Sequence, residues 1–124
     1  MTTEFQNRKV LLVEPMGKPR ILHGEKSKRA EAWRKYKRDI QYLAKKTGLE
    51  LPEGFMHLVF YLPPPASWSQ RKRENSMGLP VKVKPDWDNL AKGFFDALFD
   101  NDSQFWDVRT TKLYGLPGRI EIFF

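Results

Sequence analysis

The stretch KPDWDNLAKGFFDALF, residues 84–99, decides the predicted fold, because an extended segment passes there into an amphipathic helix. From Asp88 to about Phe99 the apolar residues recur at spacings of three and four, which is typical of a helix with one buried face. The apolar stripe of this helix consists of Leu90, Phe94, Ala97 and Leu98. Asp86 and Asp88 are both available as its N-cap. The segment predicts one of two main helices.

The other main helix is predicted over about residues 25–46, where Trp33, Tyr36, Ile40 and Leu43 form a second apolar stripe. Between the two helices, residues 66–85 are polar, basic and rich in turn-forming residues, which predicts a mobile basic loop. β-rich runs predict strands at residues 8–14, 55–62, 104–114 and 119–124.

The last two strands are expected to form a hairpin through Gly115-Leu116-Pro117-Gly118. This order of elements predicts a single α+β domain over residues 1–124, with one mixed or antiparallel sheet and two main helices.

The composition narrows the class of protein. The chain has 124 residues, with 22 Lys and Arg against 15 Asp and Glu, and a formal net charge of +7 favours a polyanionic partner such as nucleic acid. Cysteine is absent, which excludes disulfides, thiolate zinc sites and a cysteine nucleophile. No apolar run is long enough for a signal core or a membrane span, so we expect a cytoplasmic protein without a membrane partner. No nucleotide cofactor is expected.

One segment of this basic chain is rich in acidic residues and has Lys92 as its only cation. Its acidic residues are Asp86, Asp88, Asp96, Asp100, Asp102 and Asp107. Mutual repulsion among carboxylates favours a divalent cation that screens them. If the chain after Pro85 is extended, Asp86 and Asp88 point the same way, roughly 7 Å apart. Lys92 lies one helical turn beyond Asp88 and can reach the same place, and Asp102 arrives just after the helix.

Mg²⁺ suits such a set of oxygen ligands, with Mn²⁺ as a substitute, and phosphodiester hydrolysis is the chemistry that follows. Simpler interpretations exist for single residues: Asp88 as a cap only, Asp96 as a partner of Lys92, and residues 100–103 as a polar turn. Together these explain Asp96 and Asp107, but they give no reason for Asp86, Asp88 and Asp102 to converge. Spacing alone predicts a possible metal site.

Cations and one aromatic side chain are candidates for DNA contact. The loop Gly17-Lys18-Pro19-Arg20 could touch phosphate, although an ordinary turn explains it equally well. The expected DNA-binding residues are Lys18, Arg20, Arg34, Lys35, Arg38, Trp68, Arg71, Lys72 and Arg73. Trp68 could stack on exposed bases or pack beneath its loop. His23 could contact DNA, and His57 is expected to be a packed residue of a strand.

The segment Lys84–Lys92, followed by Phe95-Asp96-Ala97-Leu98 and Asp102-Ser103-Gln104, resembles the RusA family of Holliday junction resolvases. The resemblance extends to residues 17–20, 61–63, 67–69 and 119–122. It implies a RusA-like fold and a small dimeric endonuclease, dependent on Mg²⁺ or Mn²⁺, that resolves four-way junctions by paired nicks and is often carried by phages.

The resemblance also assigns roles to residues. It implies metal-binding catalytic acids at Asp86, Asp88 and Asp102 and a catalytic lysine at Lys92. One departure concerns the third acid: Asn101 stands where the family usually has the first of two adjacent acids. Asp102 is therefore ranked first as third ligand, with Asp100 in reserve.

Three further expectations complete the sequence-based account. A homodimer is expected because a junction has two symmetry-related strands to cut. The chain also has more large apolar side chains than one small core readily buries, namely Phe94, Phe95, Phe99, Phe105 and Trp106. The main alternative function is a non-enzymatic DNA-binding protein that selects branched structures and has a degenerate acidic site. A toxin-like RNase with the same metal chemistry is a weaker alternative.

Overall fold

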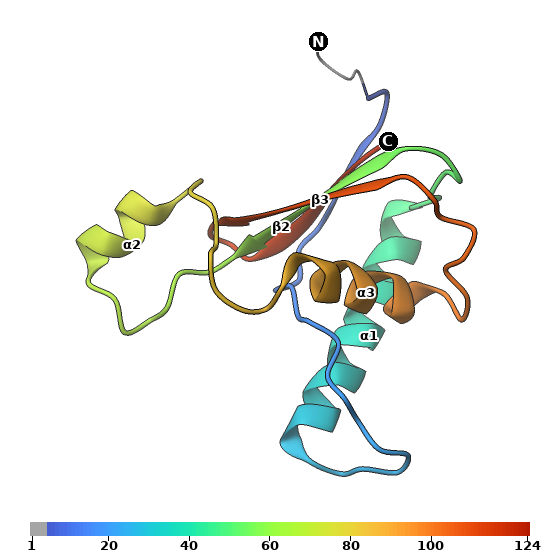
Figure 1. Ribbon diagram of the computed structural model, residues 1–124, viewed down its shortest axis with the longest axis horizontal. Helices are drawn as coiled ribbons and strands as arrows, with labels where there is room; N and C mark the ends of the chain where they lie inside the picture. Colours follow the sequence, from blue (N-terminus) through green and yellow to red (C-terminus); the bar gives the residue numbers. More distant parts are fainter. Residues whose placement is uncertain (1–4) are drawn as a thin grey trace.

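The chain folds around one mixed four-stranded sheet, as the computed structural model of residues 5–124 shows (Figure 1). Its elements in chain order are β1 (Arg8–Leu11), α1 (Lys28–Thr47), β2 (Met56–Leu62), α2 (Gln70–Ser76), α3 (Trp87–Leu98), β3 (Val108–Tyr114) and β4 (Arg119–Phe123). The predicted α+β class with a single sheet and two main helices is confirmed. No helix among residues 5–124 combines the length and the apolar character of a membrane span.

The strand order is β1-β4-β2-β3, so the predicted hairpin between the last two strands is wrong. β2 lies between them, parallel to β3 and antiparallel to β4. The connection of residues 115–118 crosses the end of β2, where the Gly115 amide donates to the Leu62 carbonyl at 3.0 Å. A Cβ at Gly115 would lie 2.5 Å from Cδ1 of Tyr61, so the missing side chain permits this crossing.

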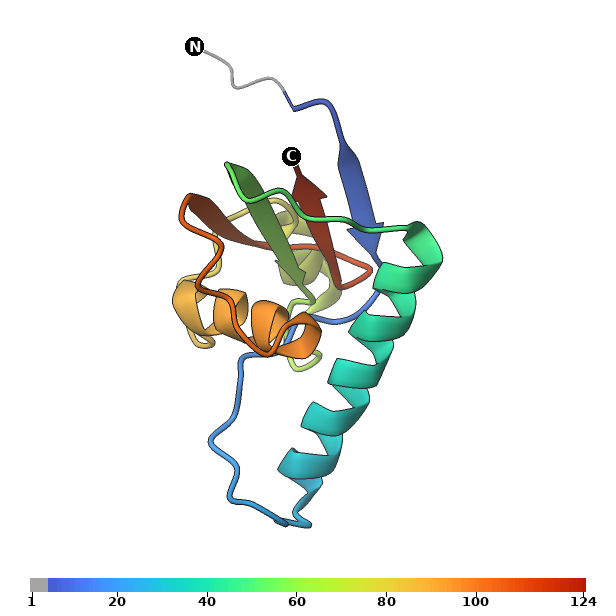
Figure 2. The same ribbon diagram turned by 90° about the vertical axis from the view of Figure 1, so that its right-hand side faces the viewer.

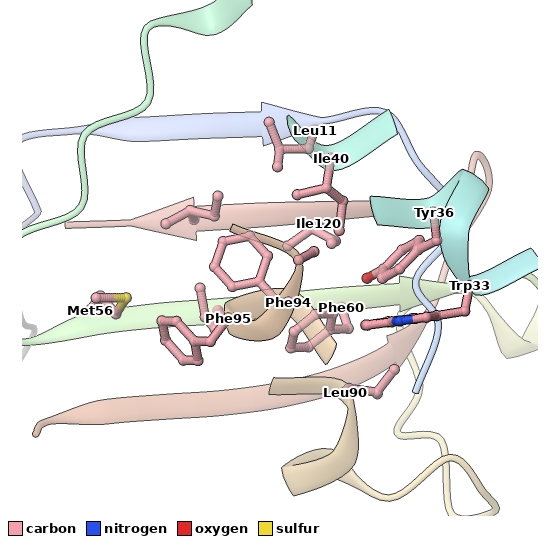
Figure 3. Close-up of a cluster of buried hydrophobic side chains, with 13 residues drawn as sticks. Leu11, Trp33, Tyr36, Ile40, Met56, Phe60, Leu90, Phe94, Phe95 and Ile120 are labelled. Atoms are coloured by element: carbon pink, nitrogen blue, oxygen red, sulfur yellow. The ribbon is translucent and has the colours of Figure 1, made fainter. Parts of the chain in front are cut away.

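Helices α1 and α3 lie on the same side of the sheet (Figure 2). Both predicted stripes are confirmed: Trp33, Tyr36 and Ile40 of α1 are buried, as are Leu90, Phe94 and Ala97 of α3. Figure 3 shows side chains from both helices converging over Phe60 of β2 and Ile120 of β4. Burial of apolar surface, at about 25 cal/mol per Å², therefore fixes α3 against the sheet.

The ends of α1 are also defined by local chemistry. The Ser27 hydroxyl accepts a hydrogen bond from the Ala30 amide at 3.1 Å, and Gly48 follows the helix with a φ of 66°. Burial raises the pKa of the Tyr36 hydroxyl, which keeps this group neutral inside the core. Residue types at both ends thus set the length of α1.

Residues 66–85 differ from the predicted loop, because they contain helix α2. Ser69 caps this helix by accepting from the Lys72 amide at 3.2 Å. The chain then runs along the edge of β3, with the Tyr114 amide donating to Leu79 at 3.0 Å and the Val81 amide donating to Lys112 at 3.2 Å. Helix α2 has no apolar stripe, so periodicity gave no sign of it.

The sheet face opposite α1 and α3 contains an ion-pair network. The buried carboxylate of Glu121 accepts from Arg8 at 2.8 Å and from Arg119 at 2.8 Å. Burial alone would raise the pKa of Glu121, but the hydrogen bonds and charges of Arg119 and Arg8 outweigh it, and the pKa lies below its ordinary value. The network joins strands β1 and β4 on this face.

Candidate functional site

The first candidate feature is the start of α3, where two aspartates stand. Asp86 is the N-cap residue, with extended backbone (φ −69°, ψ 152°), and its side chain makes no capping hydrogen bond. Asp88 lies in the first helical turn, and both residues are exposed. The partial positive charge at a helix N-terminus stabilises carboxylates in such positions. Neither carboxylate forms an ion pair with another residue in the range 5–124.

The start of α3 is held in place by β3. The Lys112 ammonium, on the helix-covered face of β3, donates to the carbonyls of Val83 at 2.6 Å and Pro85 at 2.8 Å. Pro85 directly precedes Asp86 in the chain, and Val83 lies three residues before it. Sequence reasoning missed Lys112, because its acceptors lie in residues 83–85, which reach β3 only in the folded chain.

The predicted phosphate loop packs on α3 through two glycines. A Cβ at Gly93 would lie 2.8 Å from the Met16 carbonyl oxygen, and a Cβ at Gly17 would lie 2.5 Å from Nδ2 of Asn89. The Lys18 amide donates to the Asn89 carbonyl at 3.4 Å. The absence of both side chains lets the backbones approach, and this brings the loop to the first turns of α3.

A cavity of about 610 Å³ lies between residues 18–23, α1 and α3, and we call it the basic cleft. The cations that line it are Lys18, Arg20, Arg34, Lys37 and Lys92, and no carboxylate of residues 5–124 lines it. The Lys18 ammonium pairs with Asp96 at 2.6 Å, so Asp96 is a partner of Lys18 and not of Lys92. Such a concentration of positive charge in a concave surface attracts polyanions.

The structure divides the predicted DNA-binding residues among separate places. Lys18, Arg20 and Arg34 line the basic cleft, together with the catalytic candidate Lys92. His23 and Lys37, both suggested by the sequence as possible DNA contacts, line it too, and so does Asn89, which was not.

Lys35 and Arg38 do not line this cleft. They line another depression along α1, where Lys35 pairs with Asp39 at 2.7 Å. Arg71, Lys72 and Arg73 lie on α2, and Trp68 lies just before it. The cations of α1 that were expected to contact DNA are therefore divided between two depressions.

The predicted third ligand lies at the other end of α3. With 12 residues and a rise of about 1.5 Å per residue, the helix is about 18 Å long, and the segments before and after it lie at its opposite ends (Figure 1). Asp102 belongs to the following turn, where its carbonyl accepts from Phe105 at 3.0 Å.

Asp100, the reserve ligand, borders a depression beside Asp96 and Lys18. Within residues 5–124, no three His, Cys, Asp or Glu side chains gather closely enough to hold a metal ion. The structure therefore brings Asp86, Asp88 and Lys92 to the first half of α3, and it does not bring Asp102 or Asp100 to them.

Comparison with known proteins identifies the family of the chain. Residues 13–123 match the family described as Endodeoxyribonuclease RusA. The chain belongs to the RusA family. The RusA match runs from just after β1 to the end of β4, so it includes the basic cleft and the start of α3.

The chain is also similar to the uncharacterized protein YqaN of Bacillus subtilis (strain 168). The two are 33% identical over 122 residues, which cover 86% of this chain and 84% of YqaN. Membership of the RusA family implies an endonuclease that acts on Holliday junctions and therefore binds branched DNA.

Proposed function

We propose that this protein resolves Holliday junctions by paired nicks, with Mg²⁺ as cofactor and Mn²⁺ as a substitute. The observation that supports this most is the pair of uncommitted carboxylates of Asp86 and Asp88 beside the basic cleft, in a chain of the RusA family. The carboxylates of Asp86 and Asp88 would serve hydrolysis, and the cations of the basic cleft would bind the DNA backbone. The two groups meet at the first half of α3.

Asp86 and Asp88 are the residues that would hold the ion. Mg²⁺ often binds only one or two protein carboxylates and completes its shell with water and substrate phosphate. The two side chains fit this requirement because neither is used as a helix cap or in an ion pair with residues 5–124. When bound, the ion would supply an activated water and would offset charge on the scissile phosphate.

Lys92 and the basic cleft position the DNA. Lys92 is exposed, lies one helical turn beyond Asp88 and lines the cleft, so its ammonium can hold an oxygen of the scissile phosphate. Arg20, Arg34 and Lys37 would bind neighbouring phosphates and fix the position of the strand. Lys112 acts as a positioning residue through the carbonyls of Val83 and Pro85.

The role of Asp102 is proposed separately, because it lies beyond the far end of α3. Asp102 would join Asp86 and Asp88 only after residues 99–107 rearrange on the DNA. Asp102→Asn tests this directly. An inactive Asp102→Asn variant alongside an active Asp100→Asn variant would support such a rearrangement, and an active Asp102→Asn variant would limit the ligands to the pair on α3.

A twofold dimer completes the proposal, since each chain provides one such pair of carboxylates and a junction needs two symmetric cuts. Much of the aromatic surface that favoured a dimer is covered within the chain, because Phe94 and Phe95 are buried and the rings of Phe99 and Phe105 contact each other, with centroids 5.0 Å apart. Trp106, 74% exposed, remains available to a partner. Sedimentation of the protein, alone and on a junction, tests this state, and a monomer in both conditions would contradict it.

A junction-binding protein without nuclease activity is the second candidate. It is favoured by the lack, within residues 5–124, of any group of three possible metal ligands. A four-way junction labelled on each strand separates the two candidates on a denaturing gel. With Mg²⁺ we expect symmetric nicks in two opposing strands, whereas a shifted but intact junction would favour the second candidate. Including RNA hairpins tests the RNase alternative.

A further inference from the structure

A second cavity, of about 460 Å³, lies between α2 and the edge of β3, apart from the basic cleft. We call it the α2 pocket. Its apolar walls are formed by Trp68, Leu79 and Tyr114, and Asn75 adds an amide that can donate and accept hydrogen bonds. Its volume lies within the usual range for ligand pockets, about 300–1,000 Å³.

The aromatic walls are arranged as an open platform. The ring centroids of Trp68 and Tyr114 are 5.4 Å apart with an angle of 58° between the rings, and both side chains are only half-buried. The Lys72 ammonium lies 4.1 Å from the centre of the Trp68 ring. If these rings only anchored α2 to the sheet, neighbouring apolar residues would be covered as well, yet Leu79 is 54% exposed.

The charge around the α2 pocket identifies the class of ligand. Residues 66–85 contain five cations and one anion, Glu74. Lys72 and Lys82 line the pocket itself. Aromatic faces surrounded by positive charge suit a ligand that is flat and apolar on one side and anionic on the other, which describes a nucleotide with an unstacked base.

The α2 pocket is also connected to the start of α3 through β3. Tyr114 forms its wall, and Lys112, two residues earlier on the same strand, holds the Pro85 carbonyl at 2.8 Å. Two residues of a strand span roughly 7 Å. The residue that holds the start of α3 and a wall residue of the pocket are therefore neighbours on β3, so we expect a DNA strand bound at Asp86 to pass close to the pocket.

We propose that the α2 pocket binds an unstacked base at the branch point of the DNA, against the aromatic wall that Trp68 and Tyr114 form. The inference rests on the proposed function and names the feature of the substrate that is recognised. The base displaces Lys72 from the face of Trp68, and the exposed lysine moves to an adjacent phosphate. Unstacking a base costs less free energy at a branch point, where stacking is already interrupted, than within an intact duplex. The pocket therefore favours junctions over linear DNA.

Binding measurements without divalent metal test the proposal independently of cleavage. Anisotropy of a fluorescent four-way junction and of a linear duplex with the same sequence gives the ratio of the two affinities. Trp68→Ala and Tyr114→Ala should each lower junction affinity about tenfold and leave duplex affinity unchanged. Tyr114→Phe, the matched control, keeps the ring and should bind like the wild type. An unchanged ratio in both alanine variants would overturn the proposal.

Photocrosslinking with the wild-type protein covers the case in which an alanine variant fails to fold. A 5-iodouracil placed at the branch point should crosslink to Trp68 or Tyr114, and one placed in the middle of an arm should not. Crosslinks from both positions alike, or to neither residue, would refute the pocket. If the wild type nicks junctions but these results fail, only this inference falls; if it does not nick, the proposed function fails and the binding data still decide the pocket.

Discussion

Replacing Lys37 by Ala should reduce the salt dependence of junction binding by about one phosphate contact. The basic cleft contains five cations, but Asp96 pairs with Lys18 at 2.6 Å, which leaves Arg20, Arg34, Lys37 and Lys92 to neutralise phosphates. Each neutralised phosphate contributes about −0.9 to the slope of log affinity against log salt. These four contacts contribute about −3.6 to the slope, which by itself is about a 150-fold loss of affinity between about 50 and 200 mM salt, and removing Lys37 lowers that contribution by about 0.9.

Without Lys37 the contribution of the cleft to the slope should be about −2.7, and the corresponding loss over the same range about 40-fold. Anisotropy of a labelled junction, measured over several salt concentrations, gives these slopes. Lys35→Ala is the matched control, because Lys35 lies on the same helix, outside the cleft, and pairs with Asp39. The reasoning is refuted if both variants change the slope equally, or if binding by the wild type does not respond to salt.

Three further predictions concern the frame of the site. Glu121→Gln should lower the free energy of unfolding by about 1.5–3 kcal/mol at neutral pH, because it weakens the network with Arg8 and Arg119. Since this pairing lowers the pKa of Glu121, the difference between variant and wild type should vanish as the pH falls through that lowered pKa. Chemical denaturation at several pH values measures the difference, and a difference that persists at acid pH would contradict the prediction. Gly93→Ala should lower the free energy of unfolding by about 1–3 kcal/mol, because the added Cβ would lie 2.8 Å from the Met16 carbonyl oxygen. Gly54→Ala is the control and should leave stability unchanged, because a Cβ there meets nothing within 4 Å. Equal melting temperatures of the two variants would argue against the close approach at Gly93. Lys112→Met should slow nicking while junction binding is kept, and an unchanged nicking rate would remove its positioning role.

Helices α1 and α3 and most strands were predictable because their signals are local, whereas the short helix α2 was not. The stripes of α1 and α3 repeat at helical spacing, and Ser27 and Gly48 mark the ends of α1. The order of the strands was not predictable in the same way. A four-residue connection with two glycines reads as a hairpin turn, and only the packing of Gly115 over Tyr61 shows that it crosses β2.

The part of the candidate site that lies on α3 was predictable, because helical spacing places its residues relative to one another. Asp86, Asp88 and Lys92 are close in sequence and lie along the same half of α3. Asp102 is also close in sequence, but the whole length of the helix separates it from Asp86. The role of Lys112 depends on residues 83–85 packing against β3, and this is tertiary information that spacing along the chain does not contain.

Single-turnover cleavage of a four-way junction by Asp86→Asn and Asp88→Asn tests whether these two carboxylates hold the catalytic metal. Each change removes a metal ligand and a negative charge that repels phosphate, so both variants should bind the junction at least as tightly as the wild type and nick neither strand. Asp100→Asn is the matched control, because Asp100 lies at the far end of α3 and should cleave like the wild type. Cleavage by Asp86→Asn or Asp88→Asn at the wild-type rate would contradict the assignment of these two carboxylates to the metal.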